Sequence, residues 1–305
     1  MHRVTETTRT RGSYVHMANL RTFCYRIICG FFLGFSTVAP GFSGSVVAIA
    51  MGIYRDLVNF VSHPFVDIKK NIRFLVPLAI GALLSLILFV LSFRVLFESH
   101  ARATMLLFVG LIAGNLHVIG KEVKRHEWKA RNLSGALLSF VVALGISLLV
   151  IGTGHLTGGS GAVRFWELIV GGFMAGAVAF IPGMSISAIL IVTGIYWELI
   201  MMMESLVRLQ VTYVPHVVGI VFSAILGLVL TARGIKKIFD RVPGFANACV
   251  LGFMSGTLVG IFIESLYLED PSFSWWLGGL MLLAGVGLSS VFVTLGKKMG
   301  AGAEE

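Results

Sequence analysis

Long apolar runs separated by short polar segments fill the chain, a pattern typical of membrane-spanning helices. The runs cover residues 27–39, 44–54, 74–93, 103–120 and 133–151, followed by 168–181, 184–197, 211–232, 242–263 and 275–296. A helix needs roughly 20 apolar residues to cross a bilayer. The last three runs of each set come close to that length or exceed it. We therefore predict six transmembrane helices.

The first two runs of each set are shorter, and a Pro-Gly pair separates them, Pro40-Gly41 in one set and Pro182-Gly183 in the other. Proline removes a backbone donor and glycine frees the backbone dihedrals, so a helix breaks at such a pair. Two short apolar helices joined at a break favour a re-entrant hairpin, here over residues 27–54 and 168–197. Paired full spans would give the same topology and stay open. Irregular backbone at this depth requires surrounding protein or a wet cavity.

The two sets are copies of each other. A shift of 142 residues superimposes the two Pro-Gly pairs, and twelve of the 28 positions in residues 30–57 are then identical. The repeats are residues 23–152 and 167–298, with an external linker at 153–166. Each half holds one hairpin and three spans, an odd number, so the second half enters the membrane from the opposite side. We predict an all-α polytopic membrane protein with an inverted-topology repeat.

Composition supports the membrane assignment. Hydrophobic residues make up 56% of the 305 residues and charged residues only 13%, whereas an average soluble domain carries about a quarter charged residues. So few charges could not cover the surface of a soluble globule. The three cysteines lie in or beside apolar stretches and form no disulfide framework or metal spacing. We expect no metal and no cofactor.

The net charge of +9 is explained by orientation and does not indicate a nucleic-acid partner. With the amino terminus inside, nineteen of the 24 Lys and Arg residues fall in inside segments. Outside are Arg94, Arg102, Arg164 and Arg208, and Arg55, directly after the first hairpin, completes the count. This asymmetry follows the positive-inside rule. It places both termini in the cytoplasm, with residues 1–22 as a basic cytoplasmic tail. The oligomeric state stays open.

Serine and glycine residues surround both predicted hairpin turns. The candidate binding residues are Pro40, Gly41, Ser43, Gly44 and Ser45, and Pro182, Gly183, Ser185 and Ser187. A helix that restarts after a break begins with unpartnered N–H groups, and a serine there adds a hydroxyl. Such donors at the positive end of a helix dipole favour a phosphate or carboxylate ligand. Two alternatives stay open: small residues that only permit close helix packing, and carbonyls that bind a cation.

Three ionisable residues beside the hairpins are further candidates, because charged groups at membrane depth are rare and costly. Arg55 follows the first hairpin and is a candidate partner for an anionic head group; the alternative is an arginine that extends to the interface. Glu167 and Glu198 flank the second hairpin. They are the candidates for proton coupling, and the alternative for both is a solvated carboxylate at the membrane edge.

The sequence contains no Gly-x-Ser-x-Gly elbow, no Walker loop and no His-Glu-x-x-His motif. We therefore expect a protein that is not an enzyme. A cation- or proton-coupled exchanger would need a carboxylate near the bilayer midplane, and the apolar runs hold none there. A purely structural subunit would not need two matching broken hairpins. A secondary transporter of small soluble anions would use the same hairpin turns and remains the alternative.

The hairpin motifs are Pro40-Gly41-Phe42-Ser43-Gly44 with Gly52-Ile53-Tyr54, and Pro182-Gly183-Met184-Ser185 with Gly194-Ile195-Tyr196. Over residues 23–298 the chain resembles a bacterial and archaeal membrane family associated with translocation of polyprenyl phosphate, in particular undecaprenyl phosphate. It departs from the family pattern at Ser45, Val46 and Ile186. The resemblance implies a flippase of the bacterial cytoplasmic (inner) membrane that returns undecaprenyl phosphate from the outer to the cytoplasmic leaflet for cell-envelope synthesis. The implied partner is the lipid itself, bound between the hairpin turns during alternating access.

Overall fold

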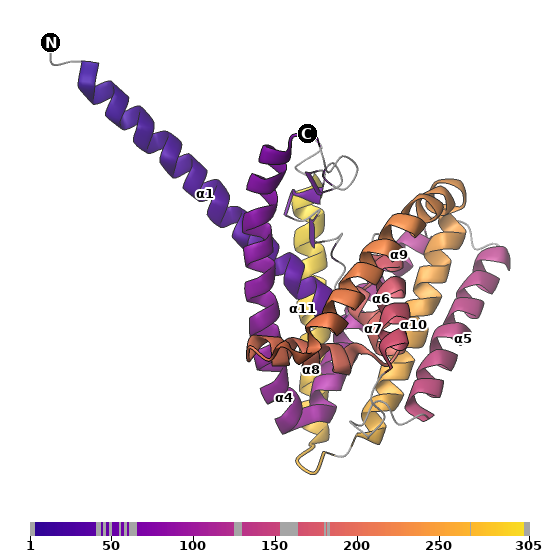
Figure 1. Cartoon of the computed structure of the whole chain (residues 1–305). Coiled ribbons are helices and arrows are strands. Elements are labelled where there is room, and N and C mark those ends of the chain that lie inside the picture. Colours follow the sequence, from indigo (N-terminus) through magenta and orange to yellow (C-terminus); the bar gives the residue numbers. More distant parts are fainter. Residues whose placement is uncertain are drawn as a thin grey trace.

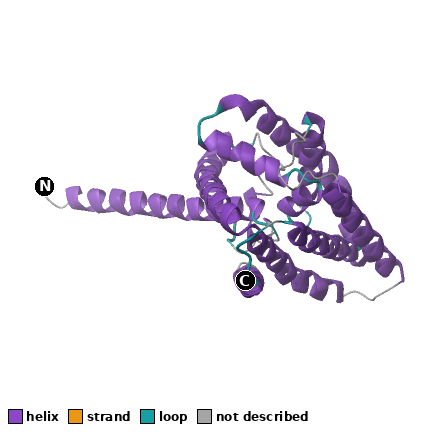
Figure 2. Ribbon diagram, turned by 90° about the horizontal axis from the view of Figure 1, so that it is seen from below, coloured by secondary structure: helices purple, strands orange, loops and turns teal. Residues whose placement is uncertain are grey.

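The computed structural model describes residues 4–301 except 41–43, 45–46, 49–50, 55, 58–59, 61–65, 125–129, 153–163, 180, 182–183 and 269. Every regular element of this described part is a helix (Figure 2). The helices are α1 (Val4–Val38), α4 (Ile68–Lys124), α5 (Ala130–Gly152), α6 (Phe165–Val178), α7 (Ile186–Val192), α8 (Tyr196–Val207), the 3-10 helix η2 (Val211–Tyr213), α9 (Val214–Arg241), α10 (Pro243–Tyr267) and α11 (Trp275–Ala301).

Within the described residues, five helical stretches are long and apolar enough to cross a membrane: Asn71–Phe93, Val95–Lys121, Ala130–Gly152, Val211–Arg241 and Pro243–Tyr267. A sixth is added if α7 and α8, which meet at a bend of 114°, form one broken span. Two shorter apolar helices are α6 and residues 275–291 of α11. The predicted all-helical, multi-spanning chain is therefore confirmed. Helix α11 has 27 residues and begins where the last predicted span begins, at Trp275.

Two helices are longer than the sequence pattern predicts. Helix α1 begins at Val4, so the described part of the basic tail continues the first hairpin helix and extends away from the other helices (Figures 1 and 2). Helix α4 contains two predicted spans. The chain reverses between them at His100, whose dihedrals are not helical (φ −149°, ψ 61°). The hydroxyl of Thr104 donates to the carbonyl oxygen of His100 at 2.8 Å, which stabilises the start of the second arm.

Close glycine contacts pack the first helix of each half against its neighbour. In the first half, a Cβ at Gly30 or Gly34 would overlap the backbone of Leu78 or Ala82 on α4. In the second half, Gly172 and Gly176 of α6 meet the backbone of α9 at the corresponding residues, Ile220 and Ala224. All four pairs correspond under the same shift of 142 residues. Equivalent sequence positions therefore make equivalent contacts.

The remaining spans exchange partners between the halves. The second arm of α4 packs against α11 of the other half, where Gly110 meets the backbone of Leu282. The corresponding helix of the second half, α10, packs against α5 of the first, where Gly252 meets the backbone of Ala136. Helices α10 and α4 also contact each other. The two halves are thus interlocked and do not form separate bundles.

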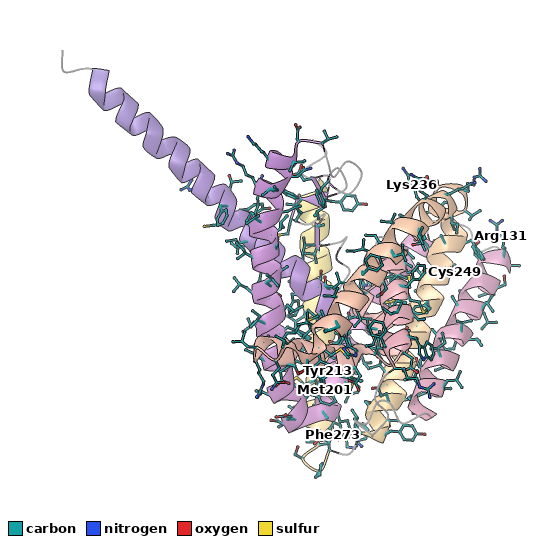
Figure 3. All side chains as sticks on the ribbon, viewed as in Figure 1. Arg131, Met201, Tyr213, Lys236, Cys249 and Phe273 are labelled. Atoms are coloured by element: carbon teal, nitrogen blue, oxygen red, sulfur yellow. The ribbon has the colours of Figure 1, made fainter. Side chains whose placement is uncertain are left out.

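Basic residues gather at one end of the helices. Arg131 at the start of α5 and Lys236 near the end of α9 lie at the upper end in Figure 3, and Phe273, in the loop before α11, lies at the opposite end. The starts of α1 and α4 and the end of α11 are on the same side as Arg131 (Figure 1). The helix ends that adjoin the basic segments of the sequence therefore lie on one side of the described structure.

Candidate functional site

Four of the predicted binding residues lie in the described part of the structure: Pro40, Gly44, Ser185 and Ser187. Pro40 is buried directly after α1, and Gly44 is partly buried. The other predicted residues lie outside the described residues; they are Gly41, Ser43, Ser45, Arg55, Pro182 and Gly183. The geometry of the site is therefore given by the second hairpin and by the end of α1.

Two buried serine hydroxyls lie where the second hairpin restarts. Ser185 precedes α7 in an extended conformation and is 1% exposed, and Ser187 is completely buried. Their hydroxyl oxygens are hydrogen-bonded at 2.7 Å. Ser185 occupies the N-cap position, but its side chain bonds Ser187 and makes no capping bond to the helix. Because α7 has only seven residues, the predicted contribution of its dipole is small, and the hydroxyl pair is the main chemical feature.

A glycine turn separates α7 from α8. Gly194 has a positive φ of 76°, its N–H donates to the carbonyl of Ile191, and the N–H of Ile195 donates to the carbonyl of Leu190. These two bonds are those of a Schellman C-cap. The first hairpin has the matching positive φ at Gly52, 65°, and the matching bond from Ile53 to Ala48. The Gly-Ile-Tyr motifs therefore encode helix ends, with a direct structural reason for the glycine.

The two hairpins meet at Tyr196. This side chain is completely buried, and its hydroxyl donates to the carbonyl oxygen of Val38 at 2.8 Å, 158 residues away in sequence. Val38 is the last residue of α1, where helix carbonyls lack intrahelical partners. Met184 and Ala188 belong to the same buried apolar cluster as Val38. The turn after α1 and the restart at α7 are thus joined within one core.

An aromatic cluster surrounds this contact. Phe93 stacks on Phe108 with ring centroids 5.9 Å apart and on Trp197 at 5.4 Å, and it meets Tyr196 edge to face at 6.4 Å. Phe97 packs against Trp197 at 4.8 Å. Aromatic pairs in such arrangements stabilise a core beyond the area they bury. The cluster fixes the start of α8 against both arms of α4.

The two predicted coupling carboxylates lie at helix starts. Glu167 is in the first turn of α6, and its carboxylate accepts a hydrogen bond from the backbone N–H of Arg164 at 3.0 Å. Glu198 is in the first turn of α8 and partly buried. Carboxylates in the first turn of a helix are favoured by its unpaired N–H groups. This local hydrogen bond explains why a carboxylate is found at position 167.

One buried carboxyl was not recognised from the sequence. Glu264 is 4% exposed, and Nε1 of Trp197 donates to its Oε1 at 3.2 Å. The predicted span ended at residue 263, whereas α10 continues to Tyr267. Extending the helical pattern by one turn would have placed this carboxyl inside the protein. The described residues hold no group of three or more side chains that could bind a metal ion.

The described helices define a multi-spanning membrane protein in which the end of α1 and the start of α8 contact each other in one core, and a buried serine pair lies at the start of α7. The family model of undecaprenyl phosphate translocase-like proteins matches residues 33–271, and the chain belongs to this family. It is 27% identical over 245 residues to the polyprenyl-phosphate transporter of Staphylococcus aureus (strain NCTC 8325 / PS 47), covering 77% of this chain and 85% of that protein. No solved structure shows a significant match.

Proposed function

We propose that the protein transports a polyprenyl phosphate and returns undecaprenyl phosphate from the outer to the cytoplasmic leaflet of a bacterial cytoplasmic membrane. Membership of the translocase-like family and the name of the Staphylococcus aureus relative support the substrate class. The long apolar tail of such a lipid can stay in the bilayer while only the head group crosses. Moving a bare phosphate through hydrocarbon is very unfavourable, so the protein must offer polar partners on the way.

The observation that carries this proposal is the buried pair of hydroxyls on Ser185 and Ser187, next to the contact of the two hairpins. With their mutual bond opened, both hydroxyls can donate to phosphate oxygens. By the repeat, Ser43 and Ser45 supply the equivalent hydroxyls from the first hairpin. Arg55 follows that hairpin and adds a positive charge for the head group. Pro40, Gly41, Gly44, Pro182 and Gly183 complete the proposed set of binding residues.

Alternating access follows from an inverted repeat in this proposal. The matched contacts of Gly34 with Ala82 and of Gly176 with Ala224 support two structurally equivalent halves. Three spans per half give those halves opposite orientations in the membrane. Rocking about the contact between Tyr196 and Val38 would then expose the hydroxyls to either leaflet in turn.

The gathering of basic residues at one end supports a cytoplasmic location for both termini. In a chain with its native cysteines replaced by serine, Lys236→Cys is expected to react with a membrane-impermeant thiol reagent only after intact cells are opened. Ser272→Cys, near Phe273 in the loop before α11, is expected to react from outside. Reaction of Lys236→Cys in intact cells would contradict the orientation.

Removal of both hydroxyls tests the binding site. Hydrogen bonds to a charged group contribute about 1.5–3 kcal/mol each. The double variant Ser185→Ala/Ser187→Ala loses two of them, so it is expected to slow transport by roughly 10²- to 10⁴-fold. The measurement is the leaflet redistribution of labelled undecaprenyl phosphate in proteoliposomes. Ser223→Ala is the matched control, because Ser223 is equally buried and bonds only the carbonyl of Ile220 in its own helix among the bonds described.

Three results would separate the parts of this account. Wild-type rates in the double variant would contradict the assignment of the serine pair, while leaving the substrate class intact. An equal loss of transport rate in Ser223→Ala would show that buried hydroxyls in general are needed for folding. Uptake of soluble labelled phosphate in place of lipid redistribution would instead support the transporter of small anions.

A further inference from the structure

A second polar contact lies outside the serine pair. Glu264, in the last turn of α10, is almost completely buried and accepts a hydrogen bond from the indole N–H of Trp197 on α8. An ionisable side chain inside a membrane helix is costly and is retained where it has a function. Burying the ionised carboxylate costs far more than burying the neutral carboxyl. The indole N–H can donate to either form, and one neutral donor offsets only part of the cost of burying the charge.

The ionisable groups at this end of α10 come mainly from α4, whose break holds Glu98, His100 and Arg102. Helix α5 has none after Arg131, and α7 has none; the ionisable residues of α9 are His216 near its start and five beyond residue 232. From α4, the guanidinium of Arg102 donates to the carbonyls of Leu266 and Leu268 and lies over the ring of Phe273, and its backbone N–H donates to Asp270. From α8, Tyr196 and Glu198 flank Trp197. Arg102 thus binds backbone carbonyls and a loop carboxylate.

Trp197 connects Glu264 to the contact of the two hairpins. Its ring lies 5.0 Å from that of Tyr196, which bonds Val38 at the end of α1. The same indole packs against Phe93 and Phe97 of α4. A change at Glu264 therefore reaches the start of α8 directly, and through Tyr196 it reaches the first hairpin.

We propose that Glu264 is a protonation latch for the second hairpin. The neutral carboxyl holds Trp197, and with it the start of α8, against α10. Once the proton is lost to water at the end of α10, the cost of burying the charge draws the carboxylate toward that water. The carboxylate then leaves the indole, and Tyr196 is free to separate from Val38. Glu264 is then the residue through which protons act on transport, in place of Glu167 and Glu198. The transport readout rests on the proposed function, but the structural readout does not.

The structural readout is the fluorescence of Trp197 in a chain whose other tryptophans, Trp128, Trp166, Trp275 and Trp276, are replaced by phenylalanine. As pH rises, we expect the emission to shift to longer wavelength, because the released indole meets a more polar environment. Glu264→Gln keeps an oxygen acceptor but cannot ionise, so it should abolish the shift. Glu204→Gln, on α8 with Trp197, is the control and should retain the shift. A shift that survives Glu264→Gln, or no shift with Glu264 intact, overturns the latch.

The transport readout is the pH profile of lipid redistribution in proteoliposomes. Wild type should show a pH-dependent rate, whereas Glu264→Gln should lose the dependence and keep the acidic wild-type rate at every pH. A profile in Glu264→Gln that parallels wild type overturns the latch even though transport occurs. If wild type transports no lipid at any pH, the proposed function is contradicted and the latch is not. The fluorescence of Trp197 then tests the latch by itself.

Discussion

At the scale of single residues, matching motifs serve the same backbone purpose but place their side chains differently. Gly52 and Gly194 both have positive φ and end a helix in the same way. The tyrosines that follow differ: Tyr196 is completely buried against the first hairpin, whereas Tyr54 is 36% exposed. Of these two tyrosines, Tyr196 therefore supplies the hydroxyl that joins the two hairpins. The sequence repeat alone predicts equal roles and cannot reveal this asymmetry.

The glycine turn gives a prediction at this scale. An L-residue in the left-handed region costs about 1–2 kcal/mol, and a Cβ at Gly194 would also lie 2.7 Å from a methyl carbon of Val150. Gly194→Ala should therefore lower the stability of the purified protein by more than this conformational cost alone. Gly52→Ala should cost only the conformational part, since nothing lies within 4 Å of its Cβ. Equal thermal stability of wild type and Gly194→Ala would contradict the turn.

At the scale of elements, close glycine approaches explain which helices pair. The long α4 is built from two spans, and each arm packs through small residues, the first on α1 and the second on α11. Small residues matter here because helices in a membrane associate by packing and not by the hydrophobic effect. The repeated Gly30 and Gly34, and Gly172 and Gly176, thus act as packing positions.

Helix packing gives a matched pair of variants. Gly176→Ala places a methyl group into the backbone carbonyl of Ala224, and overpacking of this kind costs about 1–3 kcal/mol. Gly145→Ala on α5 meets nothing within 4 Å and gains helix propensity of up to about 1 kcal/mol. Thermal unfolding in detergent should therefore rank Gly176→Ala below wild type and Gly145→Ala at or above it. The reverse order would contradict the packing of α6 on α9.

At the scale of the whole molecule, periodicity and length were sufficient to predict an all-helical membrane protein. The hydrophobic runs have the required length, and proline and glycine mark the break before α7. The exchange of partners between halves could not be predicted, because apolar faces in lipid carry no signal for which helix they meet. Glu264 was missed for a related reason: a carboxyl at the end of an apolar run reads as interfacial until the neighbouring α8 is seen to cover it.

The central claim is that this protein moves a polyprenyl phosphate between leaflets. The most direct test is to reconstitute the purified wild-type chain into liposomes that carry labelled undecaprenyl phosphate, and to follow the fraction of label accessible from outside. We predict faster redistribution than in protein-free liposomes, and a return to the protein-free rate in Ser185→Ala/Ser187→Ala. Redistribution by folded wild-type protein at the protein-free rate, across the pH range in which it is stable, would contradict the claim.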